Sequence, residues 1–302
     1  MSLIPLLLSV ASAILHASWN TLAKKSRMTE AFYAIMSLAS NCLWWHVLFW
    51  TPMPIREFPM RFWMFLGMSV AADCAYCFGL VGAYRKLDMS TAYPVMRSLP
   101  ILLTAAVTCL FGIGKMLSPT AVLGMFVVFV GCMVMPLGKF SDFSIHNYLN
   151  RNMLFLFIAA GGTTGYTILD KLAQDQIRPI AEELAISKPV LSMTFYVLRG
   201  VTLCSALTIY ALSVRGEREL WLGFFRARKI TPILAGIFAS STYVLVLIAM
   251  NYVENVSYVQ VFRQIGLVFG LLAGVIVLKE KCTLTKLLGT ALIICGLVLT
   301  VL

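Results

Sequence analysis

The chain has 302 residues, of which 60% are hydrophobic and 12% charged, and its formal net charge is +11 at pH 7. A soluble domain carries about 25% charged residues, so this composition and a mean hydropathy of +0.87 indicate an integral membrane protein. The basic residues lie between apolar runs rather than on one face, which argues against nucleic acid as a partner.

Ten apolar segments are long enough to cross a bilayer as α-helices, which takes about 20 residues each. They cover residues 3–23, 31–51, 62–84, 91–112, 119–137, 153–172, 190–214, 231–252, 257–278 and 283–302. Little of the chain is left for a soluble domain. The first segment has no basic stretch before it and no small-residue cleavage site after it, so we expect a retained span rather than a signal peptide.

The two halves of the chain repeat one pattern. The matched pairs, in order and at nearly constant separation, are Tyr76 and Tyr243, Arg97 and Arg263, Gly124 and Gly289, and Gly131 and Gly296. Five helices per repeat is an odd number, so the second copy must enter the membrane from the other side. We therefore predict an all-α integral membrane protein of ten transmembrane helices in two inverted five-helix repeats. The first repeat would span residues 1–138, a connecting loop 139–152, and the second repeat 153–302.

The distribution of basic residues predicts the topology. The loops after the odd-numbered segments hold about fifteen Lys and Arg and the other loops about six, which places the odd loops in the cytoplasm and both termini outside. In the first half the basic loops follow the first and third helices of the repeat, and in the second half they follow its second and fourth. An inverted repeat requires this switch. Residues 215–230 mix aromatic and basic side chains, which fits either an interfacial helix on an anionic leaflet or a plain basic loop.

Two arginines lie inside apolar segments at the same position of the repeat. An arginine at the bilayer centre costs about 2.5–3.5 kcal/mol on insertion scales, so Arg97 and Arg263 are candidates for function. Tyr93 precedes Arg97 by one helical turn and shares its face. Arg97 could bind a carboxylate or phosphate bidentately, or its side chain could extend to the interface. Arg199 has no counterpart in the first half, and either a cavity charge or a structural charge fits it.

The first apolar segment carries a polar face. His16 and Asn20 are one helical turn apart, and Trp19 lies beside them. One interpretation is a wall of a substrate cavity; the other is hydrogen bonding between helices, which contributes under about 1 kcal/mol per pair. We see no cluster of metal ligands and no nucleophile–base pair, so we expect neither a metal nor another cofactor.

Two acidic side chains lie inside predicted spans. Asp73 is near the middle of its segment, and it either carries a proton during transport or pairs with Arg97, which we favour. Asp170 lies late in its segment, at a depth near that of Arg263, although an ordinary helix-end charge also fits it. Three tyrosines could join these charges in a cavity: Tyr76, Tyr166 and Tyr243.

Several short motifs resemble the drug/metabolite transporter superfamily, EamA type. They are His16-Ala-Ser-Trp-Asn20 with Lys24, Ala92-Tyr-Pro-Val-Met-Arg97-Ser-Leu-Pro100, Tyr166-Thr-Ile-Leu-Asp170-Lys171, and Leu278-Lys-Glu280. The resemblance covers nearly the whole chain and implies ten helices in two inverted repeats, a central cavity and carrier-type transport of small metabolites. One departure is Gln264, where the resemblance leads us to expect Glu, which weakens a role in proton coupling there.

The leading hypothesis is a secondary-active transporter of a small polar metabolite by alternating access, in the inner or plasma membrane. An anionic or zwitterionic substrate fits the arginines, and both amino acids and small phosphorylated or phosphonate compounds carry such charges. The alternative is a carrier for a cationic amine held by Trp19 and the three tyrosines. A membrane-embedded lipid-modifying enzyme or a non-transporting scaffold is the alternative of another class. A proton is the candidate coupling ion, and Gln264 is counted among the candidate substrate-binding residues. Both a monomer and a homodimer stay open.

Overall fold

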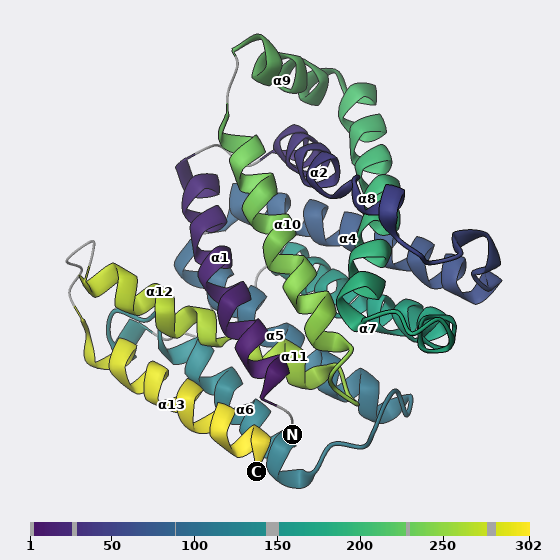
Figure 1. Ribbon diagram of the computed structural model, residues 1–302. Helices are drawn as coiled ribbons and strands as arrows, with labels where there is room; N and C mark the ends of the chain where they lie inside the picture. The colour runs from purple at the N-terminus through teal and green to yellow at the C-terminus, as the bar shows by residue number, and fades with distance from the viewer. Residues whose placement is uncertain (1–2, 26–28, 88, 143–150, 228–229, 277–281) are drawn as a thin grey trace.

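The computed structural model describes residues 3–25, 29–87, 89–142, 151–227, 230–276 and 282–302. The fold is all-helical, with 83% helix and no strand among these residues. The α-helices are α1 Ile4–Lys25, α2 Glu30–Trp44, α3 Val47–Trp50, α4 Met60–Lys86, α5 Met89–Leu110, α6 Pro119–Val134, α7 Met153–Glu183, α8 Lys188–Ser213, α9 Arg215–Arg226, α10 Thr231–Met250, α11 Ser257–Phe262, α12 Ile265–Ile276 and α13 Leu284–Val301 (Figure 1). Short 3-10 turns cover Ile55–Glu57 and Phe140–Asp142.

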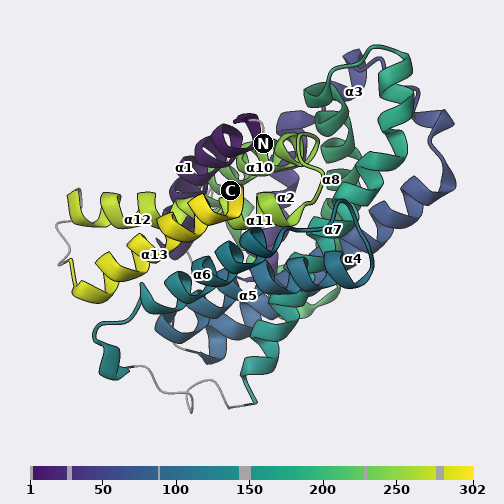
Figure 2. The ribbon, with the colours of Figure 1, turned by 90° about the horizontal axis from the view of Figure 1, so that it is seen from below.

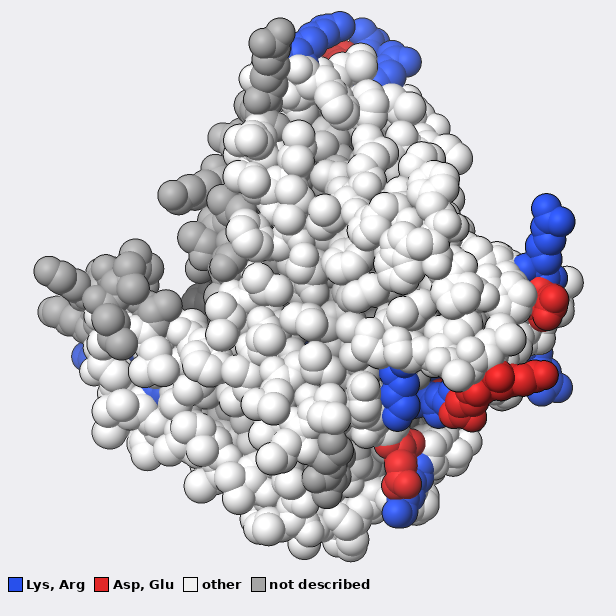
Figure 3. All heavy atoms as spheres, in the orientation of Figure 1, with Lys and Arg blue, Asp and Glu red and all other residues white. Residues whose placement is uncertain are grey.

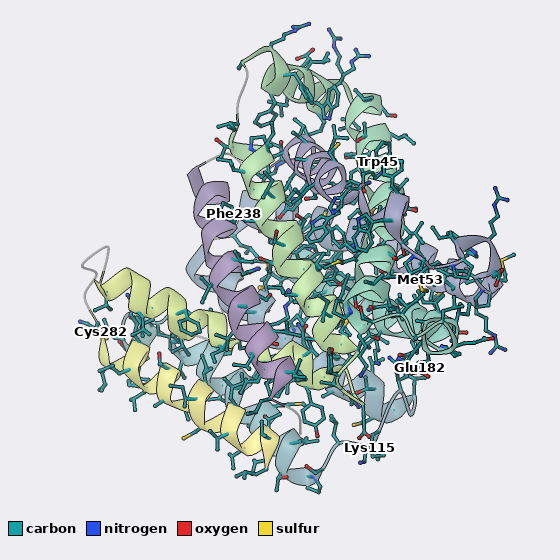
Figure 4. All side chains as sticks on the ribbon, in the orientation of Figure 1. Trp45, Met53, Lys115, Glu182, Phe238 and Cys282 are labelled. Carbon is teal, nitrogen blue, oxygen red and sulfur yellow. The ribbon has the colours of Figure 1, made fainter. Side chains whose placement is uncertain are left out.

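The helices and the surface are those of a membrane protein. Within the described part of the chain, six helices are long and apolar enough to cross a membrane: Glu30–Trp50, Met60–Ala83, Met153–Glu183, Lys188–Ser213, Thr231–Met250 and Leu284–Val301. Shorter apolar helices are Ile4–His16, Val95–Leu110, Pro119–Val134 and Ser257–Leu272. Charged side chains gather over α9 and along the opposite edge, where Lys115 and Glu182 lie, and a broad uncharged face separates them (Figures 3 and 4).

The principal helix contacts join the N-terminal half of the chain to the C-terminal half. Helix α4 packs along α7, α6 along α13, and α1 along α10, while α2 contacts both α8 and α10 (Figures 1 and 2). The largest apolar core contains side chains from both halves, including Phe62, Phe195 and Leu247, all fully buried. Neither half therefore encloses its own core, and the interior of the molecule belongs to both.

The contact between α6 and α13 depends on glycine. A Cβ added to Gly124 would lie 2.7 Å from the carbonyl oxygen of Gly296, and one added to Gly296 would lie 2.7 Å from that of Gly124. A Cβ on Gly131 would lie 2.8 Å from the carbonyl oxygen of Gly289. These distances are shorter than real Cβ contacts, so the absence of side chains lets the two backbones approach closely.

Several elements differ from their predicted bounds. Helix α7 continues to Glu183, past the expected end at residue 172. Lys171 Nζ donates to Asp175 Oδ1 at 2.9 Å, and Arg178 also donates to Asp175. These pairs one turn apart satisfy the charges that had indicated a helix end. The segment 257–278 is also interrupted, because α11 ends at Phe262 and α12 begins at Ile265.

Residues 215–226 form helix α9 rather than a plain loop. The Glu217 carboxylate accepts the backbone N–H of Ala31 at 2.9 Å and an N–H of Arg85 at 3.3 Å, and Arg85 also donates to Glu30 at 2.9 Å. Ala31 lies in the first turn of α2, where backbone N–H groups lack partners within the helix. This contact fixes α9 across the ends of α2 and α4. Its position on a lipid leaflet stays a prediction.

Candidate functional site

A cavity of about 140 Å³ lies between α2, α4, α7, α8 and α10. Predicted site residues in its lining are His16, Asp73, Tyr76, Tyr166, Tyr243 and Arg263. Unpredicted residues in its lining include Tyr33, Ser40, Tyr196 and Ser240, and the lining also contains Arg199, for which the sequence allows a cavity charge. The cavity is smaller than the roughly 300–1,000 Å³ of drug-binding pockets, which suits a small solute.

Arg199 is the centre of the charged residues around this cavity. Its Nη2 donates to Asp73 Oδ2 at 2.7 Å, and its Nε donates to Asp170 Oδ1 at 3.0 Å and to Ser69 Oγ at 3.1 Å. Ser69 also donates to Asp170, and the hydroxyl of Tyr243 donates to Asp170 Oδ2 at 2.5 Å. Asp170 is fully buried, while the Asp73 side chain keeps 14% of its surface exposed. Two carboxyl groups thus share one guanidinium.

The predicted pairing of Asp73 with Arg97 is wrong. Asp73 pairs with Arg199 on α8, and so does Asp170, which had been matched in depth to Arg263. Sequence position indicates depth along a helix but not the neighbour that a face meets. Helix α4 packs against α7 and α8, so its carboxylate meets a residue of the C-terminal half. The role of Arg199, left open by the sequence, is that of a buried counter-ion.

Three tyrosine rings line one wall of the cavity. The ring of Tyr166 lies edge to face with Tyr76 and Tyr243, at centroid distances of 5.9 and 5.7 Å. The Arg199 guanidinium carbon lies 5.6 Å from the centroid of Tyr166 and 5.2 Å from that of Tyr243. A cation within about 6 Å of a ring is attracted by its electrons, so the rings of Tyr166 and Tyr243 already face a cation that belongs to the protein.

The two repeat arginines lie near each other, at the interruption between α11 and α12. Arg97 Nη2 donates to the backbone carbonyl oxygen of Arg263 at 3.3 Å, and Arg97 Nη1 lies 3.3 Å from His16 Nε2. Arg263 donates to Gln260 Oε1 at 3.3 Å and is not ion-paired with any carboxylate in the described part of the chain. The Arg263 side chain lines the cavity, whereas Arg97 contacts the backbone behind it.

Gln264 is not among the residues that line the cavity. Its Nε2 donates to the backbone carbonyl oxygen of Gln260 at 3.1 Å, and the side chain is buried outside the cavity lining. The side chains of Trp19, Asn20 and Tyr93 lie outside the described part of the structure. Ser69 was not predicted, although its spacing of one helical turn from Asp73 places both on one face of α4.

Comparison with known proteins identifies the class of protein that this fold and cavity define. The model of the EamA-like transporter family matches residues 150–302, just over half of the chain. The chain therefore belongs to the EamA-like transporter family, within the drug/metabolite transporter superfamily, which confirms the resemblance drawn from the short motifs.

The fold also has counterparts among solved structures, of which 27 chains match. One of them, described only as the crystal structure of a protein, superposes with a TM-score of 0.67. The superposition covers 98% of this chain and 95% of the solved chain. The sequence identity is 15%, so the likeness concerns the fold alone. No curated protein matches the sequence.

Proposed function

We propose that the protein is a secondary-active carrier of a small zwitterionic or anionic metabolite, amino-acid-like in its charges, in the inner or plasma membrane. The observation that supports this most directly is the cavity between helices of both halves, where Arg263 faces the Arg199 cluster of Arg199, Asp73, Asp170, Ser69 and Tyr243. A polar solute bound there would be exposed to either side by movement of one half against the other.

The helix contacts support two inverted repeats. Matching the halves in order equates α1 with α7, α2 with α8, α4 with α10, and α6 with α13. This exchange turns the α4–α7 contact into the α10–α1 contact and leaves α6–α13 and α2–α8 unchanged. The same exchange matches Gly124 with Gly289 and Gly296 with Gly131. It therefore turns the contact of Gly124 with Gly296 into the contact of Gly289 with Gly131, which is also present. We therefore infer ten spans in repeats of residues 1–138 and 153–302.

The charges of the cavity favour a zwitterionic substrate. Arg263 offers a guanidinium that is not engaged by a described carboxylate, and such a group binds a substrate carboxylate or phosphate well. The Arg199 cluster has one carboxylate more than it has guanidinium groups, and Asp73 is its partly exposed member. An ammonium group, or a coupling proton, would compensate this excess. A solute with both an anionic and a cationic group would match both sides.

A carrier for quaternary amines is less well supported by this geometry. The faces of Tyr166 and Tyr243 are occupied by the Arg199 guanidinium. A second cation placed there would meet a positive charge at short range, in a low-dielectric site where repulsion is strong.

Uptake by the purified full-length protein in proteoliposomes tests the proposal. Labelled amino acids, small phosphorylated compounds and choline are offered with and without an inwardly directed proton gradient. We expect saturable uptake of a zwitterionic or anionic compound, competition within that class, and none by choline. Uptake of choline alone would contradict the substrate class, and no uptake of any compound by folded protein would contradict the carrier function.

A further inference from the structure

A second pocket, of about 420 Å³, lies outside the central cavity, where the distal part of α7 meets the start of α8 and the end of α10. It is lined chiefly by Lys171, Asp175, Arg178, Lys188, Asn251 and Tyr252. It lies at the end of the molecule where Lys115 and Glu182 are found, opposite α9 (Figure 4). None of these side chains contacts the central cavity.

The charges of this pocket are only partly neutralised by the protein. Asp175 accepts from both Lys171 and Arg178, so two cations share one carboxylate. Lys188 lies 4.3 Å from the centroid of the Tyr252 ring and forms no ion pair with a described carboxylate. The remaining carboxylate of the lining, Glu254, pairs with Lys115 at 3.1 Å.

One of these cations is held in an unusual environment for a charge. The Lys171 side chain is only 7% exposed, whereas the Arg178 side chain is 29% exposed and Lys188 reaches the surface. Burying an ammonium group with one shared carboxylate is costly. An additional anion in the pocket would supply Lys171 with a second partner. Arg178 and Lys188 would bind the same anion from the open side of the pocket.

A buried polar chain connects this pocket to the central site through α7. Arg178 Nη2 donates to Asn251 Oδ1 at 3.1 Å, and Asn251 Nδ2 donates to Gln174 Oε1 at 2.7 Å. Ser192 Oγ also donates to Gln174 Oε1 at 2.9 Å, and the Gln174 amide lies 3.4 Å from the backbone carbonyl oxygen of Asp170. Arg178 is thereby held by Asn251, at the end of α10, and through Asn251 by Ser192 of α8, so its guanidinium is preorganised.

We propose that this pocket is an oxyanion-binding site, in which Lys171, Arg178 and Lys188 bind a phosphate or carboxylate group. The guanidinium of Arg178 and the ammonium groups of Lys171 and Lys188 supply charge-assisted donors from α7 and α8, which is the chemistry that binds such groups. The same chemistry is presented by a free solute and by an anionic lipid headgroup at this end of the helices. The proposal concerns binding and does not depend on the carrier function.

The thermal stability of the purified full-length protein tests the site. Inorganic phosphate is titrated at constant ionic strength against chloride, and a ligand that binds the native state raises the melting temperature saturably. In parallel, nanodiscs of phosphatidylcholine are compared with nanodiscs that contain phosphatidylglycerol. A response to phosphate identifies a free solute as the source, and a response to phosphatidylglycerol alone identifies the lipid headgroup.

Charge-matched variants make the test specific. Lys188→Gln removes an exposed cation that is not ion-paired with any described carboxylate, so the protein should fold, and Arg178→Gln removes the guanidinium. Each should raise the half-saturating phosphate concentration, or weaken the lipid response, about tenfold. Arg56→Gln removes the same charge from an exposed turn that is not in the pocket lining, and should leave the response unchanged. No response to either anion, or equal responses in Lys188→Gln, Arg178→Gln and the unmodified protein, would overturn the proposal.

Discussion

The α6–α13 contact and the Arg199 cluster differ in how the two halves of the chain contribute to them. In the α6–α13 contact, Gly124 and Gly296 present their backbones to each other reciprocally, and each half contributes the same kind of residue. In the Arg199 cluster, α4 supplies Ser69 and Asp73, and the C-terminal half supplies Asp170, Arg199 and Tyr243. The two halves therefore contribute alike to the packing of α6 against α13, but they contribute different polar groups to the Arg199 cluster.

Under the proposed two-repeat architecture, the difference shows how two similar halves can form one specific site. Close packing of two backbones needs only small residues, which both copies can keep. A site for one asymmetric solute needs different groups on its two sides. The positions of Arg97 and Arg263 repeat this contrast on a smaller scale, because α5 is continuous through Arg97, whereas Arg263 stands where α11 ends.

The largest effect on stability is expected from Arg199→Gln, which removes the central cation of the Arg199 cluster. It leaves Asp73 and Asp170 without their shared counter-ion, and an uncompensated buried charge costs about 3–5 kcal/mol. The melting temperature in detergent should fall sharply. Asp170→Asn is the matched control: it leaves Arg199 paired with Asp73, so its effect should be much smaller. Equal losses in the two variants would show that the excess carboxylate is not the feature that matters.

The next effect separates the two repeat arginines. Arg263→Gln should reduce uptake in proteoliposomes about a hundredfold, because two charge-assisted hydrogen bonds to a substrate anion are lost. Arg97→Gln should reduce it only about tenfold, since Arg97 acts through the backbone of Arg263 as a positioning residue.

The Michaelis constant distinguishes the two roles of these arginines further. Arg263→Lys, which keeps the charge, should recover part of the affinity, whereas Arg97→Lys should recover little because the fork-shaped geometry is lost. If Arg97→Gln proved the more damaging change while the protein stayed folded, the assignment of the two roles would be reversed.

The smallest effect concerns the symmetric contact. Gly131→Ala places a methyl group 2.8 Å from a backbone oxygen of α13 and should cost about 1–3 kcal/mol by overpacking, measured as a lower melting temperature. Gly296→Ala meets the backbone of Gly124 at 2.7 Å and should cost a similar amount. Gly161→Ala, in α7, meets nothing within 4 Å and should be neutral or slightly stabilising. A large difference between Gly131→Ala and Gly296→Ala would contradict the reciprocal packing.

Six residues of the cavity lining are among the candidates taken from the sequence, because charged and aromatic groups stand out inside apolar segments. The cost of burying Asp73, Asp170 and Arg263 marks them without any structure. The same cost should have marked Arg199 as a member of the group, but it had no repeat counterpart to support it. The pairs themselves could not be predicted, because periodicity within one helix does not say which helix lies opposite each face.

Hydropathy and composition by themselves determined that the chain is a helical membrane protein, and the motifs determined its family, since insertion into lipid leaves few solutions for the backbone. The interruption at Arg263, the extension of α7 past its charges and the sharing of Arg199 by two carboxylates were decided only by the tertiary structure. Each depends on contacts between residues far apart in the chain, where a side chain is satisfied or excluded by neighbours that local sequence does not specify.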